Sequence, residues 1–187
     1  MTPRIDKEMI RSIVAIGLIS WTTCPAAWGQ FDGTDLRSAV ISMSRKNHCH
    51  FVQSDPTDIR QCPTYSVSIA GDGTVTYEGR GGVRTLGKRT HKTTLESVRV
   101  LLAEFERADF FSLRDRYEQV QVGDLMQTID HAIATTVSIS VAGRTKSVYD
   151  FYGTPEVVKR LEQRIDEASD SRRYTGRPPD NARQPTS

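Results

Sequence analysis

The densest group of potential metal ligands is His48-Cys49-His50, which Asp55 and Asp58 follow. His91 or His131 could join them in the folded chain. A zinc site needs three or four ligands in tetrahedral arrangement, and alternate residues of a strand share one side. The simpler interpretation, which we prefer, is that these are exposed histidines beside a disulfide. We therefore expect no metal ion or other cofactor.

A second group, formed by Asp124, Asp130 and His131, lies in a stretch without clear periodicity. Irregular segments often carry binding and catalytic residues, so a hydrolase-type or metal-dependent enzyme is the alternative function. Other catalytic signatures are missing. No Gly-x-Ser-x-Gly occurs, and Gly79-Arg80-Gly81-Gly82 lacks the Lys-Ser/Thr of a phosphate-binding loop. These patterns favour a non-enzymatic protein.

The first residues have the order of a secretory leader. Arg4, Lys7 and Arg11 precede an apolar stretch at 13–21, and small residues follow it. Ala27 and Gly29 stand two apart, which favours cleavage after Gly29. We expect residues 1–29 to be a cleavable signal peptide, 30–169 a single domain, and 170–187 a disordered polar tail in a periplasmic or secreted protein.

Cys24 raises the alternative of a lipid-anchored structural envelope protein. A lipidated cysteine normally follows Leu and small residues, whereas Trp21-Thr22-Thr23 precedes Cys24. We therefore expect Cys24 to leave with the leader. Cys49 and Cys62 then remain, and an even count in an oxidising compartment predicts a disulfide between them. It would close a short polar loop and stabilise the fold by about 2–4 kcal/mol.

Alternating apolar and polar residues predict most of the strands. The strongest prediction is a hairpin, in which strands at 65–69 and 74–79 flank the turn Gly71-Asp72-Gly73. Asp72 suits turn geometry better than calcium binding. Further strands are expected at 39–44, at about 83–91, at 135–141 and at 145–152.

Two helices are expected. Thr93 and Glu96 have capping-box spacing, and the helix they start would run to about Ala108. Thr154-Pro155 would start the second helix, which ends near Ser169. The expected inward residues of the two helices are Leu95, Val98, Leu101, Leu102, Phe105, Val158, Leu161, Ile165 and Ala168. The predicted fold is an α+β two-layer sandwich, an antiparallel sheet with two amphipathic helices on one face.

Composition excludes some partners. The formal net charge is +2, from 25 basic and 23 acidic residues, so nucleic acid is not an expected partner. After the leader, no stretch approaches the roughly 20 apolar residues of a membrane-spanning helix.

The stretch from Cys62-Pro63-Thr64-Tyr65 to the Gly71-Asp72-Gly73 turn resembles a bacterial envelope family known as domain of unknown function 6438. Segments 110–117 and 143–150 and the helix after Pro155 fit the same pattern, so the resemblance covers about residues 39–168. It implies an exported α+β domain with no assigned activity. The family's two cysteines usually lie closer together than Cys49 and Cys62 do.

We therefore expect a non-enzymatic binding module of the bacterial cell envelope. Its partner would be a protein or another envelope component. The contact surface would be an exposed sheet face or the Cys49–Cys62 loop. Further candidate surface residues are His48, His50, Asp124, Asp130 and His131.

Overall fold

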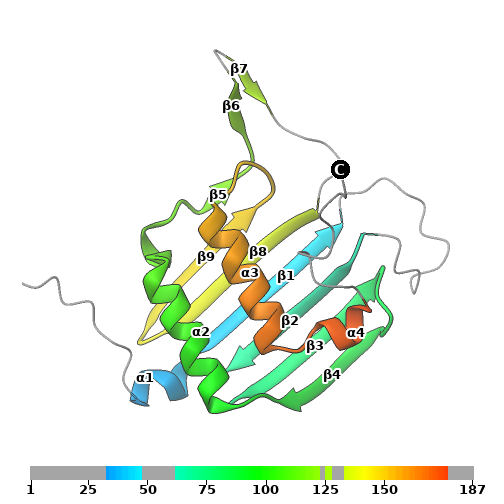
Figure 1. Ribbon diagram of the computed structural model, residues 1–187, viewed down its shortest axis with the longest axis vertical. Coiled ribbons are helices and arrows are strands. Elements are labelled where there is room, and N and C mark those ends of the chain that lie inside the picture. Colours follow the sequence, from blue (N-terminus) through cyan, green and yellow to red (C-terminus); the bar gives the residue numbers. More distant parts are fainter. Residues whose placement is uncertain (1–32, 48–61, 123–124, 128–132, 177–187) are drawn as a thin grey trace, which may run out of the picture.

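The computed structural model describes residues 33–47, 62–122, 125–127 and 133–176. These residues form an α+β fold on a seven-stranded mixed sheet with the strand order β4-β3-β2-β1-β8-β9-β5 (Figure 1). Its strands are β1 (Val40–Asn47), β2 (Thr64–Ala70), β3 (Thr74–Gly81), β4 (Gly87–Lys92), β5 (Arg116–Tyr117), β8 (Ile133–Val141) and β9 (Arg144–Asp150).

The expected hairpin is formed by β2 and β3. Val67 pairs with Tyr77, and Ile69 with Val75. Gly73 has φ +79°, and a side chain there would meet the carbonyl oxygen of Thr93 at 2.6 Å. Asp72 stabilises the turn, because its carboxylate accepts hydrogen bonds from the Thr74 amide at 2.8 Å and from the Thr74 hydroxyl at 2.9 Å.

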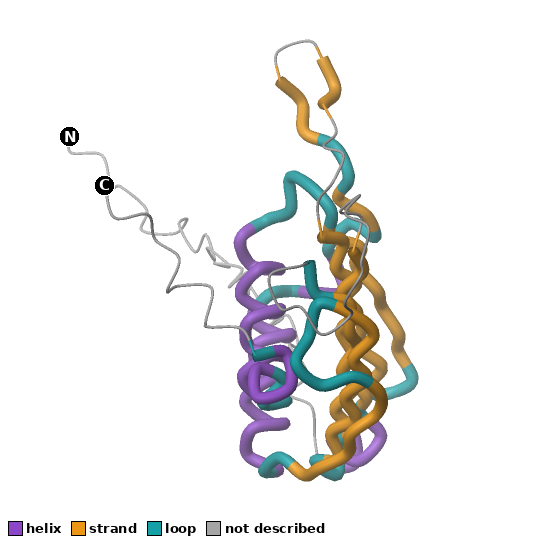
Figure 2. Tube along the Cα trace, turned by 90° about the vertical axis from the view of Figure 1, so that its right-hand side faces the viewer, coloured by secondary structure: helices purple, strands orange, loops and turns teal. Residues whose placement is uncertain are grey.

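The sheet is mixed and not purely antiparallel, because β5 pairs with β9 in parallel. The stretch around Asp124, which shows no clear periodicity in the sequence, contains β6 (Val120–Val122) and β7 (Leu125–Gln127), which pair with each other. Figures 1 and 2 show this small hairpin projecting beyond the end of the main sheet. Its short strands carry too few residues for a periodic pattern to stand out.

Helices α2 (Leu95–Arg107) and α3 (Glu156–Ala168) contact each other and lie beside the same side of the sheet (Figure 2). The N-cap of α2 is Thr94, one residue later than expected, and its hydroxyl accepts from the Ser97 amide at 3.0 Å. Leu95, expected to face inward, is 47% exposed because it lies at the first turn. Before α3, Thr154 bonds the Asp150 carboxylate, and Pro155 is the N-cap.

Residues 170–176 lie in the segment that the sequence places in the polar tail. The structure describes a turn and a short helix there, α4 (Arg172–Thr175). The backbone of α4 is bound to the segment between β3 and β4, because the Thr85 amide donates to the Tyr174 carbonyl at 2.9 Å. Residues 177–187 lie outside the described part of the chain.

The core lies between the inner side of the sheet and the helices. Ile41, Met43 and Val67 contribute from the strands, and Phe105 and Ile165 from α2 and α3. Two short elements also contribute to the core. Helix α1 (Gly33–Ser38) contributes Leu36, and the 3-10 turn η1 (Phe110–Ser112), which follows α2, contributes Phe110. Among the described residues, no helix is long and apolar enough to cross a membrane.

Candidate functional site

The sheet carries two polar regions, one on each side of the same strands. The first is a buried group of charges beneath α3. On the inner side, Arg45 is paired in register with Tyr65 on β2 and with Thr135 on β8, and Thr135 is paired with Asp150 on β9. Glu162 and Asp166, four residues apart on α3, are buried above this row. We call this group the charge network: Arg45, Tyr65, Asp150, Lys159, Glu162, Asp166 and Ser171.

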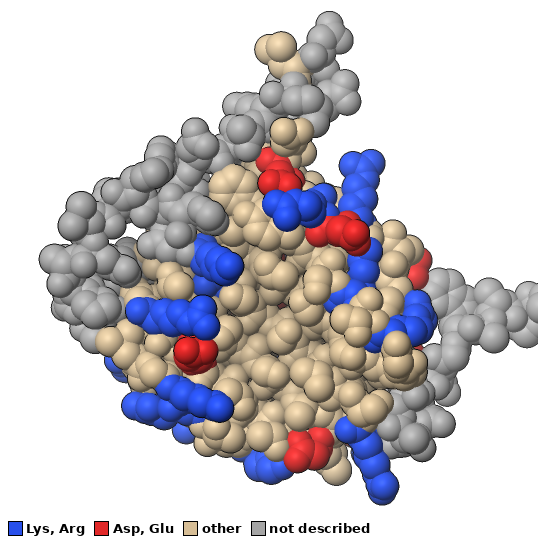
Figure 3. Space-filling model, turned by 180° about the vertical axis from the view of Figure 1, so that it is seen from behind, with Lys and Arg blue, Asp and Glu red and all other residues tan. Residues whose placement is uncertain are grey.

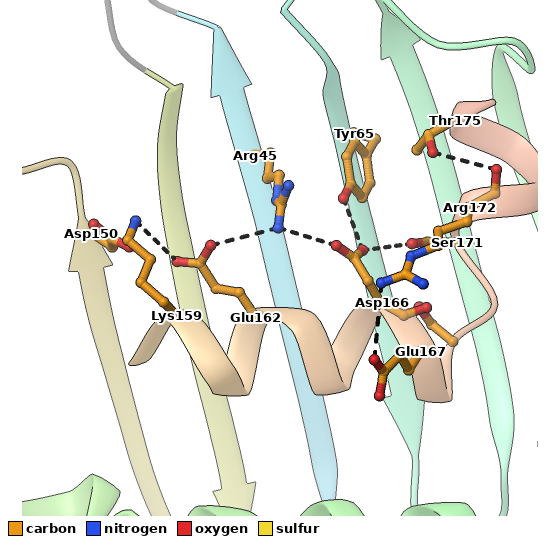
Figure 4. Close-up of polar contacts among 11 residues, drawn as sticks. Arg45, Tyr65, Asp150, Lys159, Glu162, Asp166, Glu167, Ser171, Arg172 and Thr175 are labelled. Carbon is orange, nitrogen blue, oxygen red and sulfur yellow. Dashed lines mark hydrogen bonds and ion pairs between the residues drawn. The ribbon is translucent and has the colours of Figure 1, made fainter. Parts of the chain in front are cut away.

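Arg45 lies between the two carboxylates of α3 (Figure 4). Its Nη2 is 3.1 Å from Asp166 Oδ2 and 3.5 Å from Glu162 Oε2. The other oxygen of Asp166, Oδ1, accepts from the Tyr65 hydroxyl at 2.8 Å and from the Ser171 hydroxyl at 2.5 Å. Asp166 thus joins β1, β2, α3 and the turn before α4. Burial is the main cause that raises the pKa of Tyr65, so this phenol stays a hydrogen-bond donor.

The second half of the charge network pairs two carboxyl groups. Lys159 contacts Asp150 and lies 4.0 Å from Glu162 Oε1. Burial, together with the hydrogen bond to Asp150, raises the pKa of Glu162 to about 8. Burial also acts to raise the pKa of Asp150, but hydrogen bonds from Glu162, Lys159 and Thr154 outweigh it and lower that pKa. The raised pKa favours the protonated form of Glu162 at neutral pH, whereas the lowered pKa of Asp150 favours its charged form.

This protonation balances the charge network. Asp150 and Asp166 are then matched by Lys159 and Arg45, as a buried environment requires. The carboxylates, the phenol and the hydroxyl are directed at one another and not into an open space. The described residues do line a cavity of about 280 Å³ elsewhere, between α2 and α3, with Val100 and Leu101 in its wall.

A row of stacked rings continues from Tyr65 to the other edge of the sheet. Tyr65 and Tyr77 stack with ring centroids 5.8 Å apart, and Tyr77 and Tyr174 with centroids 4.7 Å apart. The Tyr174 hydroxyl lies 3.3 Å from His91 Nδ1. This is where the structure places His91, one of the histidines considered for zinc. Within the described residues, no group of three or more His, Cys, Asp or Glu could hold a metal ion.

The second polar region is the opposite side of the sheet. Thr90, Thr76, Ser68, Ser42, Ser138 and Ser147 are register neighbours in turn, across six strands from β4 to β9. Shorter rows flank this one. Together they form what we call the hydroxyl floor: Ser42, Ser44, Ser66, Ser68, Thr74, Thr76, Thr90, Thr136, Ser138, Ser140, Thr145 and Ser147.

The members of the hydroxyl floor are all partly or fully exposed. Figure 3 looks onto this side and shows a centre without charge, with Lys and Arg side chains and several Asp and Glu side chains around it. On β8 and β9 the hydroxyls contact one another: Ser138 lies 2.8 Å from Ser147, and Thr145 donates to Ser140 at 3.1 Å. Each hydroxyl offers one donor and two acceptor positions, so this surface keeps hydrogen-bonding capacity toward solvent.

Most candidates named from the sequence lie outside the described residues: His48, Cys49, His50, Asp55, Asp58, Asp124, Asp130 and His131. Cys62 is described and half-buried. Because Cys49 is not among the described residues, the Cys49–Cys62 disulfide stays a prediction, as does any role for the acidic and histidine group at 124–131.

Neither polar region is among the sites expected from the sequence. The sequence does contain a signal for both regions, because side chains alternate between the two sides of a strand. Ile41, Met43 and Arg45 therefore share one side of β1, and Ser42 and Ser44 share the other. Arg45 therefore had to point toward the core. Similarly, Glu162 and Asp166 directly follow the inward-facing Leu161 and Ile165 on the helix. Polar residues at core-facing positions are the signature that was overlooked.

Comparison with known proteins places the chain in a family. No protein with a curated description is significantly similar to the chain. The model of the family described as "Domain of unknown function (DUF6438)" matches residues 60–169, more than half of the chain. The match begins before β2 and ends after α3, so it includes every member of the charge network except Arg45 and Ser171. The chain therefore belongs to the DUF6438 family.

Proposed function

We propose that this protein is a non-enzymatic binding module exported to the bacterial cell envelope, and that the hydroxyl floor is its contact surface. The observation that carries the proposal is the uninterrupted row of six hydroxyl side chains across six strands. Serine is not among the residues that strands favour, so strand formation does not account for its repetition on the central strands.

The proposal includes a two-layer sandwich in which α2 and α3 cover one face and leave the other for a partner. Its support is the division of burial within single strands. On β1, Ile41 and Met43 are 0% and 1% exposed, whereas Val40 on the other side is 42% exposed. The charge network supports the same division, because Asp166 of α3 contacts Arg45 on β1 and Tyr65 on β2 from the inner side.

Export is the second part of the proposal and depends on the leader at 1–29. The test is to express the full chain with its own leader in a bacterium and to measure the mass of the mature protein. We expect a chain that begins at Gln30 in the periplasmic fraction and has no free thiol until it is reduced. A full-length cytoplasmic chain, or two thiols reactive without reduction, would contradict this part.

Binding is tested by sedimentation with a bacterial envelope fraction. Ser42→Glu places a charged and bulky side chain in the middle of the hydroxyl floor, whereas Ala103→Glu places the same side chain at an exposed position on α2. We expect wild type and Ala103→Glu to sediment with the envelope and Ser42→Glu to stay in solution. Equal behaviour of the two folded variants would contradict the hydroxyl floor as the contact surface. Circular dichroism checks that both are folded.

A further inference from the structure

A line of basic side chains borders the hydroxyl floor. Lys88, on β4, lies opposite Glu78 on β3, and Arg80 is 3.1 Å from the Glu78 carboxylate. Lys46 lies two residues after Ser44 on β1. Arg116, on β5, lies over the ring of Tyr149, 4.5 Å from its centroid, and Tyr149 is the register neighbour of Thr136. We call Lys46, Arg80, Lys88 and Arg116 the basic border.

The charges at this border are predominantly positive. Glu78 is paired with Arg80, and Glu118 with Arg116. Lys46 and Lys88 are exposed and make no ion pair with another described residue. A partner lying on the hydroxyl floor would therefore meet neutral hydroxyls along its length and uncompensated positive charge along one side.

The composition of this surface disfavours a protein as the partner. Protein interfaces are enriched in aromatic residues and Met, and Ser, Thr and Val are rare among their energetically important positions. A compact small molecule would need a concave pocket, whereas the six-hydroxyl row is about 24 Å long at the usual strand spacing. A linear polymer that carries many hydroxyl groups matches both the length and the chemistry of the row.

We propose that the hydroxyl floor and the basic border bind a linear anionic glycan, a polysaccharide whose sugar hydroxyls hydrogen-bond to the serines and threonines. Its carboxylates pair with the lysines and arginines of the basic border. This inference rests on the proposed function and names the chemistry of the envelope component. The border sets the preference for charge, because Lys46 and Lys88 make no ion pair with another described residue and would gain an anionic partner from the polymer.

The experiment compares two polymers of the same backbone, polygalacturonate and its fully methyl-esterified form, by calorimetric titration of the mature protein. We expect binding to polygalacturonate that weakens with added salt, and much weaker binding to the uncharged ester. In Lys46→Gln/Lys88→Gln, binding to polygalacturonate should weaken about tenfold. The matched control is Arg99→Gln/Arg107→Gln, which removes the same charge from α2 and should bind as wild type does.

A second variant tests the hydroxyls separately. Ser42→Val/Ser138→Val removes two hydroxyls of the central row and adds residues that strands favour, so it should fold and bind severalfold more weakly. Absence of binding to polygalacturonate, equal affinity for both polymers, or wild-type binding by Lys46→Gln/Lys88→Gln would overturn the inference. Envelope sedimentation separates this failure from that of the proposed function. If Ser42→Glu still abolishes sedimentation, the contact surface stands and only the glycan is wrong.

Discussion

The two sides of the central sheet are built from the same strands, but their polar residues differ in burial and in what they contact. On the inner side, the charge network is buried and each of its groups is directed at another group of the chain. On the outer side, the hydroxyl floor is exposed and directed at solvent. Polarity alone therefore does not mark a binding surface. The inner groups stabilise the fold because their partners are internal, whereas the outer groups have capacity left for a ligand.

The largest effect on stability is expected from a substitution at the centre of the charge network. Arg45→Ala removes the cation between Glu162 and Asp166 and leaves buried carboxyls without it, which should lower the free energy of unfolding by about 4 kcal/mol. Urea denaturation of the oxidised protein measures this. A loss below about 1 kcal/mol would mean that the contacts of Arg45 behave like a surface ion pair.

The next effect concerns the attachment of α4. Tyr174 is 8% exposed and stacks on Tyr77, so Tyr174→Ala should cost about 3 kcal/mol by leaving a cavity. Tyr174→Phe is the control, because it keeps the ring and loses only the contact with His91, at about 1 kcal/mol or less. Thermal unfolding of both variants compares them. Equal stability of Tyr174→Ala and wild type would show that the stacked rings do not hold α4.

A smaller effect depends on pH. Because the folded-state pKa of Glu162 is raised from 4.5 to about 8, the folded protein binds more protons than the unfolded chain between these values. The contribution of Glu162 to stability is therefore complete below about pH 4.5 and decreases as the pH rises, until it is lost above about pH 8. Asp150, whose pKa is lowered, contributes in the opposite sense but only at acidic pH.

Glu162→Gln isolates that contribution. The amide cannot ionise and keeps the shape of the protonated acid, so the variant should lose the decline in stability between pH 5 and 8. Urea titrations of both proteins across this range measure the difference. Parallel pH profiles for wild type and Glu162→Gln would show that Glu162 does not hold the proton.

The smallest effect is expected on the outer side. Ser42→Ala changes an outward side chain of the same strand that carries Arg45, and the free energy of unfolding should change by no more than about 0.5 kcal/mol. Binding to the envelope, in contrast, should weaken measurably. A destabilisation comparable to that of Arg45→Ala would contradict the division between a structural and a binding side.

Much of the architecture followed from local patterns in the sequence. Alternation along β2, β3 and β8 identified these strands, and Gly71-Asp72-Gly73 identified the turn, because the side chains that decide these elements are neighbours in the chain. The buried face of α2, with Val98, Leu101 and Phe105, is predictable from the sequence for the same reason. The family resemblance was likewise carried by consecutive residues, and the family match confirms it.

Tertiary structure alone decided the partners of the inward polar residues. Tyr65 and Asp166 are 101 residues apart, and no local pattern states that Arg45 will lie between two carboxylates of α3. The parallel pairing of the short β5 and the docking of α4 depend in the same way on surfaces that exist only after the sheet has formed. The alternation of side chains along β1 fixes which side of the sheet each of its residues faces. Only the register between strands turned isolated serines and threonines into one continuous row.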